Sequence, residues 1–229
     1  TCGFRPVVRL FFTYYLIFAV EGRRNGDFYM KNGSEYRALA REQLGGQLFG
    51  NTWLYAVLIA LIYTAVSSLL GATGFGVILM FLIEGFFMTG VAVISMKLVH
   101  GGKEIDFNDL LAAKDNIGAA LLLGLMRNLF TLLWTLLFIV PGIIKAYAYS
   151  QCYYLFAEHP EWDWKMCLSE SEKMMRGKKW SLFCLDLSFL GWWIVGALCL
   201  GVGTLWVAPY HIMARANFYE DLSHEPIVE

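Results

Sequence analysis

The stretch WTLLFIVPGIIKAYAYSQCYYLFAE, residues 134–158, decides the fold because a Pro-Gly pair at its centre separates two apolar segments. Upstream of the pair, residues 117–140 form an apolar run long enough to cross a hydrocarbon core of about 30 Å at about 1.5 Å per residue. Downstream, Pro141 fits the first turn of a new helix, and Gly142 permits a tight reversal. The stretch therefore predicts the tip of a helical hairpin in a membrane.

The composition of the whole chain also indicates a membrane protein. Of 229 residues, 58% are hydrophobic and 16% are charged, whereas soluble domains contain about 45–50% apolar and about 25% charged residues. The formal net charge of −1 argues against a nucleic-acid binder, which needs clustered and unbalanced Lys and Arg. The five cysteines include no C-x-x-C pair, so we expect them to be small core residues.

Further apolar segments predict additional crossings of the membrane. They cover residues 53–70, 75–99, 141–157, 180–200 and 204–219. Together with residues 117–140, they predict an all-α, polytopic membrane helix bundle with six transmembrane helices in three hairpins. We expect a single six-span domain over residues 30–222, short amphipathic helices on its cytoplasmic side, and a C-terminal tail over residues 223–229.

Residues 1–29 are expected to be a non-native upstream extension. Their apolar run, residues 10–20, is too short to cross a bilayer, and no small-x-small cleavage site follows it. Codons for residues 26–30 could also hold a ribosome-binding sequence followed by a start at Met30. After that start, Asn32 and Glu35 predict a capping box, and the apolar periodicity predicts a short helix on the membrane surface.

The positions of lysine and arginine predict the orientation. Twelve of them lie in segments that the six crossings would place on one side, and the three tight turns on the other side contain none. By the positive-inside rule, we expect a multi-pass protein of the plasma membrane with both termini cytoplasmic. Lys145 is the exception, because it lies about one turn from the outer end of its span and is expected to snorkel outward.

An amphipathic helix is expected within residues 158–179, where Asp163 can cap the start and Gly177 the end. The residues that would form the interfacial surface are Trp164, Lys165, Lys173, Met174, Met175 and Arg176. Two interpretations remain open for this segment. It is either a plain interfacial helix on the lipid bilayer or a docking surface for anionic lipid head groups or a membrane protein partner.

Four charged residues lie inside predicted spans and form a candidate intramembrane cluster: Glu84, Arg127, Asp186 and Lys145. A charge at the centre of a span costs about 2.5 kcal/mol or more, so we expect these side chains to face one another or water. Arg127 lies between the two carboxylates in predicted depth, and its guanidinium can pair with either Glu84 or Asp186. Such pairing is either structural or part of a transport or proton pathway.

No catalytic or metal-binding constellation emerges from the sequence. The four histidines lie far apart without H-E-x-x-H or comparable spacing, and no serine stands in a nucleophile elbow. His211 and Arg215 share a helix face at i, i+4, which we interpret as a polar helix end. Asp106 is better explained as a helix cap than as a cation ligand. We therefore expect a protein that is not an enzyme and has no cofactor or metal.

Three segments resemble a known family in their order and spacing. They are LLFIVPGIIKAYAYS (residues 136–150), SEKMMRGKKWSLFCLDLSFLGW (residues 171–192) and GTLWVAPY (residues 203–210). They are similar to the uncharacterised integral membrane proteins of domain-of-unknown-function family 975, over about residues 35–222. The resemblance implies a bacterial, mainly Gram-positive, multispanning protein. Its broader group includes membrane domains attached to some glycerophosphodiesterases, and no known activity is implied.

Two functions of different classes remain open. One is a non-enzymatic membrane scaffold, or a stress- or immunity-type factor, that acts through its cytoplasmic helices. The alternative is a small transporter or permease that uses a central intramembrane charged path. A water-filled cavity that reaches Arg127 would favour transport, whereas a sealed bundle would favour the scaffold.

Overall fold

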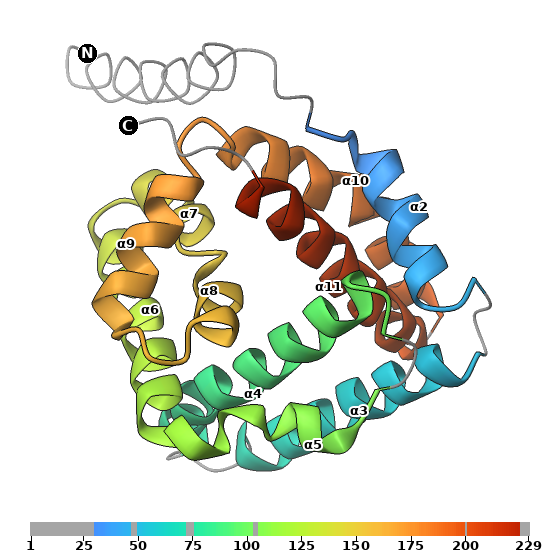
Figure 1. Ribbon diagram of the computed structural model, residues 1–229, viewed down its shortest axis with the longest axis horizontal. Coiled ribbons are helices and arrows are strands. Elements are labelled where there is room, and N and C mark those ends of the chain that lie inside the picture. Colours follow the sequence, from blue (N-terminus) through green and yellow to red (C-terminus); the bar gives the residue numbers. More distant parts are fainter. Residues whose placement is uncertain (1–29, 47–49, 72–75, 103–104, 200, 225–229) are drawn as a thin grey trace, which may run out of the picture.

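The computed structural model describes residues 30–46, 50–71, 76–102, 105–199 and 201–224, and every regular element within these residues is a helix. The all-α prediction is therefore confirmed for this part of the chain. In chain order, and as labelled in Figure 1, the elements are α2 (Gly33–Gln43), α3 (Asn51–Gly71), α4 (Gly76–Val99), α5 (Phe107–Leu110), η1 (Ala112–Asn116), α6 (Ile117–Leu137), α7 (Ile139–Ala148), α8 (Cys152–Glu158), α9 (Trp164–Met174), α10 (Lys179–Leu198) and α11 (Val202–Ser223). The predicted upstream extension and most of the predicted tail lie outside the described residues.

Three of the described helices are long and apolar enough to cross a membrane. The segments are Asn51–Leu70 in α3, Ile117–Leu137 in α6 and Lys179–Leu198 in α10. The prediction of six such helices is therefore corrected to three for the described residues. Leu69 on α3, Leu136 on α6 and Leu198 on α10 are 76%, 83% and 79% exposed, so the ends of these helices present apolar side chains outward.

The three other predicted spans differ from these helices because they are shorter or lie between other helices. The segment at residues 141–157 is divided between α7 and α8 by a turn at residues 149–151. The Ser171 hydroxyl inserts at this break, since it accepts from the Gln151 amide at 3.2 Å and donates to the Ala148 carbonyl at 2.7 Å. Neither α7, of 10 residues, nor α8, of 7 residues, is long enough to span a bilayer alone.

Helices α4 and α11 fill the second and sixth predicted segments, but both are surrounded by other helices. α4 contacts α3, α5, α6, α8 and α11. α11 contacts α2, α3, α4 and α10, and its side chains are mostly buried from Val207 to Leu222. Figure 1 shows α11 crossing the middle of the molecule between α10 and α4. These helices form the interior that the outer helices cover.

The chain reverses between α6 and α7 close to the predicted tip. α6 ends at Leu137, Phe138 is extended with φ −155° and ψ 135°, and α7 begins at Ile139. Pro141 lies in the first turn of α7, where its ring and missing N–H prevent α6 from continuing past the Leu137 carbonyl. Gly142 acts through close packing, because a Cβ there would lie 2.2 Å from the Thr135 hydroxyl oxygen on α6.

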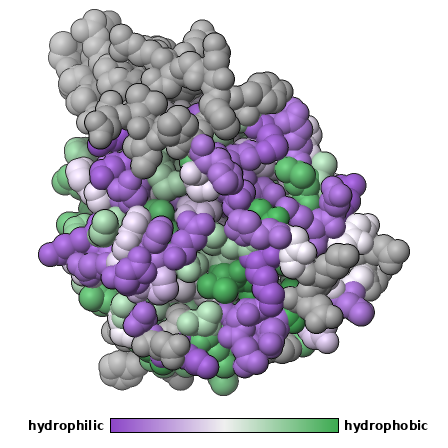
Figure 2. Space-filling model, viewed as in Figure 1, coloured by the Kyte–Doolittle hydropathy of each residue, from purple (hydrophilic) through white to green (hydrophobic). Residues whose placement is uncertain are grey.

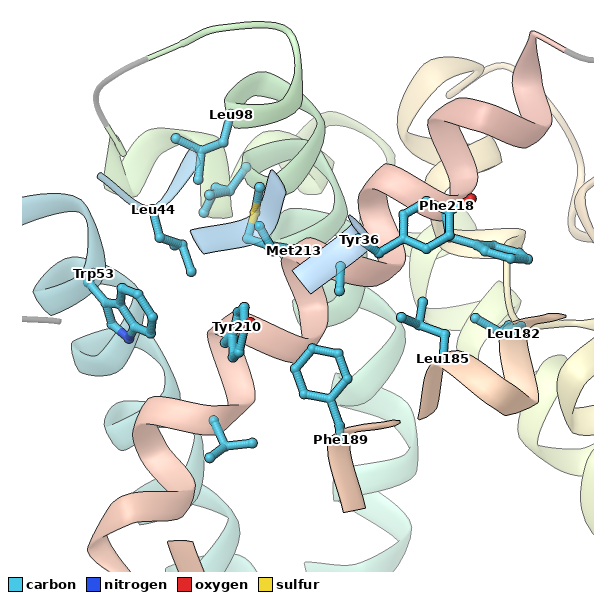
Figure 3. Close-up of a cluster of buried hydrophobic side chains, with 14 of the residues drawn as sticks. Tyr36, Leu44, Trp53, Leu98, Leu182, Leu185, Phe189, Tyr210, Met213 and Phe218 are labelled. Atoms are coloured by element: carbon cyan, nitrogen blue, oxygen red, sulfur yellow. The ribbon is translucent and has the colours of Figure 1, made fainter. Parts of the chain in front are cut away.

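The core around α11 includes a helix that the sequence placed on the membrane surface. The predicted capping box of Asn32 and Glu35 is present at the start of α2. The apolar face of α2, however, is buried in the protein, where the Tyr36 ring packs at a tilt against Phe218 of α11, with ring centroids 5.6 Å apart. Figure 3 shows Tyr36 close to Phe218, with Phe189 and Tyr210 in the same cluster. Helix α2 is therefore part of the tertiary core.

A second core cluster lies around α8 and includes residues of α4, α6, α9 and α11. Its buried members include Tyr153 and Phe156 of α8 and Cys167 of α9. Hydrophilic and hydrophobic residues are interspersed on the face of the molecule shown in Figure 2. The two clusters meet along α4 and α11, and the charged residues discussed below lie in this region.

Candidate functional site

Glu84, Arg127 and Asn128 form the first of two charged clusters inside the bundle. The Arg127 Nη1 atom lies 3.7 Å from the Glu84 Oε1 atom, and the Asn128 amide nitrogen donates to the Glu84 Oε2 atom at 2.7 Å. The Arg127 guanidinium also lies 5.1 Å from the ring centroid of Tyr153 on α8. Of the two carboxylates predicted as partners of Arg127, Glu84 is the one that contacts it.

This cluster exists because the backbones of α4 and α6 touch. A Cβ built on Gly85 would lie 2.2 Å from the Ala120 carbonyl oxygen, and one built on Gly124 would lie 2.4 Å from the Gly85 Cα. Only glycine allows such an approach at both positions. The contact places Glu84, next to Gly85, opposite the turn of α6 that carries Arg127 and Asn128.

Asp186 belongs to a second cluster, with residues of α7 and α11. One carboxylate oxygen lies 2.7 Å from His211 Nε2 and accepts from Arg215 Nε at 3.0 Å. The other accepts from the Tyr147 hydroxyl at 3.0 Å and from Arg215 Nη2. The interpretation of His211 and Arg215 as a plain polar helix end is therefore wrong. Their i, i+4 spacing was the signal, because it directs both side chains to one carboxylate.

Lys145 is separate from both clusters and does not extend outward alone. Its Nζ atom lies 2.6 Å from Glu172 Oε1 on α9. The same ammonium lies 5.6 Å from the ring centroids of Trp134 and Tyr149. α7 and α9 pack against each other and bring this acidic partner within reach, so the ammonium is paired within the protein.

The predicted interfacial residues divide between the interior and the surface. Asp163 caps α9 as expected, by accepting from the Trp164 amide at 2.8 Å. Trp164 stacks at 6.0 Å from Phe130 of α6, Met175 is fully buried, and Met174 packs against both core clusters. The exposed members are Lys165, Lys173 and Arg176. The apolar face of α9 is thus occupied by the protein itself.

A cavity of about 160 Å³ lies where the two charged clusters meet. Arg127 of the first cluster lines it, and so do His211 and Arg215 of the second. Its remaining polar lining comes from the turn between α7 and α8 and from α8 itself, through Ser150, Gln151, Tyr153 and Tyr154. Glu84 and Asp186 are not among the residues that line it, so the cations face the cavity and their carboxylate partners lie behind them.

Three buried polar atoms of the cavity residues have no well-formed hydrogen bond to any described residue. They are the Nε atom of Arg127, the hydroxyl of Tyr153 and the Oε1 atom of Gln151. Burial raises the pKa of Tyr154 to about 12 and also raises the pKa of Tyr153, although the neighbouring arginines oppose this. Both tyrosines therefore remain protonated donors at neutral pH. Two of the three unused atoms, on Arg127 and Tyr153, are donors, and Gln151 Oε1 is an acceptor. A buried site with such donors beside two arginines is suited to a small anion.

The described residues contain no group of His, Cys, Asp and Glu side chains that could hold a metal ion. Among these residues, the histidine contacts with carboxylates are those of His211 with Asp186, of His159 with Glu161, and of His100 and His224 with Glu220. The cavity chemistry is therefore that of arginine and hydroxyl donors.

Comparison with known proteins identifies one family. Its model, described as "Protein of unknown function (DUF975)", matches residues 30–146 and 138–225, which together make up most of the chain. No curated protein and no solved structure matches the chain.

Proposed function

We propose, from the premise that the chain belongs to the DUF975 family, that the protein binds a small anion within the membrane and is of the transporter or permease class. The cavity lined by Arg127, His211 and Arg215 carries this proposal. A bundle without such a cavity would have favoured the membrane scaffold. A cavity that reaches Arg127 favours the small transporter or permease with a central charged path.

Arg127 is the residue with the most donor capacity to spare. A guanidinium offers five N–H donors. Its Nη1 atom has long contacts of 3.7 Å to Glu84 and 3.4 Å to Asn128, and Nε is unpaired. Arg215, in contrast, is held by Asp186 through two nitrogen atoms. We therefore assign Arg127 and the Tyr153 hydroxyl as the main ligand contacts, with Arg215 and His211 as the opposite wall.

The membrane setting is part of the same proposal. α3, α6 and α10 are the helices that would cross the bilayer of a bacterial plasma membrane, with the N-terminal end of α3 at its cytoplasmic side. Three crossings alone would place the two termini on opposite sides. Leucines exposed along α3 and α6, such as Leu61 and Leu133, would contact lipid. A bilayer also strengthens the electrostatic interactions of the cavity, because charges attract more strongly where water is excluded.

Thermal unfolding of the purified protein in detergent tests the anion site, with inorganic phosphate as the probe and chloride added to keep the ionic strength constant. A ligand present at about 100 times its Kd stabilises the folded state by about 2.7 kcal/mol, so the melting temperature should rise and then saturate. Tyr153→Phe should abolish the shift without unfolding the protein, because among the described residues the lost hydroxyl interacts only with Arg127 and has no well-formed hydrogen bond.

Arg176→Gln is the matched control for Arg127→Gln, because Arg176 is exposed just beyond α9. It should leave the phosphate shift unchanged, whereas Arg127→Gln should remove it. The binding proposal fails if phosphate, sulfate and acetate all leave the wild-type melting temperature unchanged, or if Arg127→Gln and Tyr153→Phe respond to phosphate as the wild type does. Uptake of the bound anion into proteoliposomes then distinguishes transport from binding alone.

A further inference from the structure

A second hollow lies between α2, α3, α10 and α11, and shares no lining residue with the anion cavity. Its volume is about 460 Å³. One end is formed by Arg41, Trp53 and Tyr210, and the other by Val195, Gly196, Cys199 and Gly203. The two ends differ in chemistry, since the first carries polar donors and the second is apolar.

The polar end holds two buried donors that the fold does not use. Trp53 and Tyr210 are only 2% and 4% exposed, yet the Trp53 indole N–H and the Tyr210 hydroxyl form no hydrogen bond with any described residue. Figure 3 shows the Trp53 side chain turned toward Tyr210, and their ring centroids are 5.9 Å apart. Buried donors of this kind are normally paired, so their presence beside an open groove indicates a ligand that accepts hydrogen bonds.

Arg41 adds a positive charge at the same end. Its guanidinium carbon lies 6.0 Å from the ring centroid of Tyr210, and Arg41 forms no ion pair within the described part of the chain. An indole N–H and a guanidinium can only donate, and the tyrosine hydroxyl can also donate. The group that matches all three is an anionic acceptor such as a phosphate.

The apolar end follows the α10–α11 hairpin for about 10 Å, which is the rise from Gly203 to Tyr210 along α11. The two helices touch there, because a Cβ on Gly203 would lie 2.7 Å from the Gly196 Cα. The hollow continues along this contact beside Val195, which is 55% exposed. Since α10 is a candidate span, this end of the hollow would open toward the hydrocarbon of the bilayer.

We propose that this groove binds one anionic phospholipid of the surrounding bilayer. The phosphate lies between Arg41, Trp53 and Tyr210, where it accepts their hydrogen bonds, and one acyl chain lies along Val195, Gly196 and Gly203. Aromatic and arginine side chains are the usual contacts for head groups at a membrane interface. The site shares no lining residue with the anion cavity, and it rests on the proposed function only for its membrane setting.

Native mass spectrometry of the delipidated full chain tests this site. Phosphatidylglycerol and phosphatidylcholine with identical acyl chains are added separately. One arginine near a lipid phosphate is worth about 1 kcal/mol, or about fivefold in affinity. The wild type should therefore retain one phosphatidylglycerol about fivefold more tightly than phosphatidylcholine, and inorganic phosphate alone should not displace it because it lacks the acyl chain.

Variants separate the two ends of the groove. Arg41→Gln should remove the preference for phosphatidylglycerol, and Val195→Trp, which fills the apolar end, should weaken both lipids. Tyr210→Phe should weaken both lipids without lowering the melting temperature of the lipid-free protein, which distinguishes a ligand contact from a structural one. Arg176→Gln is the charge-matched control and should bind as the wild type. Equal binding of the two lipids by the wild type, or an unchanged preference in Arg41→Gln, would overturn the proposal.

Discussion

Arg127→Leu should destabilise the protein by about 2–4 kcal/mol, and most of this loss should depend on Glu84. Removing one partner of a buried ion pair costs about 3–5 kcal/mol because the other charge is left unpaired. The loss of the cation–π contact with Tyr153 adds up to about 2 kcal/mol. Two features reduce the sum. The Arg127 and Glu84 side chains remain 20% and 24% exposed, and Glu84 keeps its 2.7 Å hydrogen bond from Asn128.

Double-mutant cycles identify the partner. In the double variant Arg127→Leu/Glu84→Leu, neither charge remains unpaired. Its loss of stability should therefore be about 1–2 kcal/mol smaller than the sum of the losses in the two single variants. Asp186→Leu combined with Arg127→Leu should be additive within about 0.5 kcal/mol, because Asp186 is bound by Tyr147, His211 and Arg215 and shares no partner with Arg127.

The assay is unfolding of the purified protein in mixed micelles with increasing dodecyl sulfate, followed by tryptophan fluorescence, for all four corners of each cycle. Additive behaviour of the Glu84 cycle would show that the 3.7 Å contact contributes nothing to stability. A coupling of more than about 1 kcal/mol in the Asp186 cycle would refute the separation of the two clusters.

Three further predictions concern packing, thiol chemistry and orientation. Gly85→Ala should destabilise the fold by about 1–3 kcal/mol because its Cβ meets a backbone oxygen at 2.2 Å, whereas Gly118→Ala, with no atom within 4 Å, should be neutral or stabilising in the same unfolding assay. At pH 8, maleimide should label the exposed Cys199 but not Cys167 in the folded protein. Burial raises the pKa of Cys167 to about 12 and so lowers the fraction of its reactive thiolate. Rapid labelling of Cys167 before unfolding would contradict this. In intact cells an impermeant reagent should reach Cys199 but not a cysteine placed at Lys173, and labelling at that position from outside would reverse the proposed orientation.

Local features of the fold were predictable because they depend on neighbours in the sequence. The helical class follows from long apolar runs, and the reversal after α6 follows from the restricted backbone of Pro141. The caps at Asn32, Asp106 and Asp163 follow from side chains that reach amides only a few residues away. The charges of the candidate site were also visible, since a charge in an apolar run requires a partner.

The partners of those charges were decided by contacts between segments far apart in the sequence. The apolar runs predicted a span at both α3 and α11, but only α3 is apolar enough to cross a membrane. α11 is surrounded by four helices, and its polar residues find partners there. The backbone contact between Gly85 and Gly124 brings Glu84 to Arg127, and the hydroxyl of Ser171 breaks the segment that sequence reasoning read as one span. The sequence by itself determined the helices, their ends and the presence of buried charge, because these follow from local backbone and solvation energies. Only the tertiary structure decided which helices face outward, which charges pair and where a cavity remains, because these depend on how side chains from different helices fill the same space.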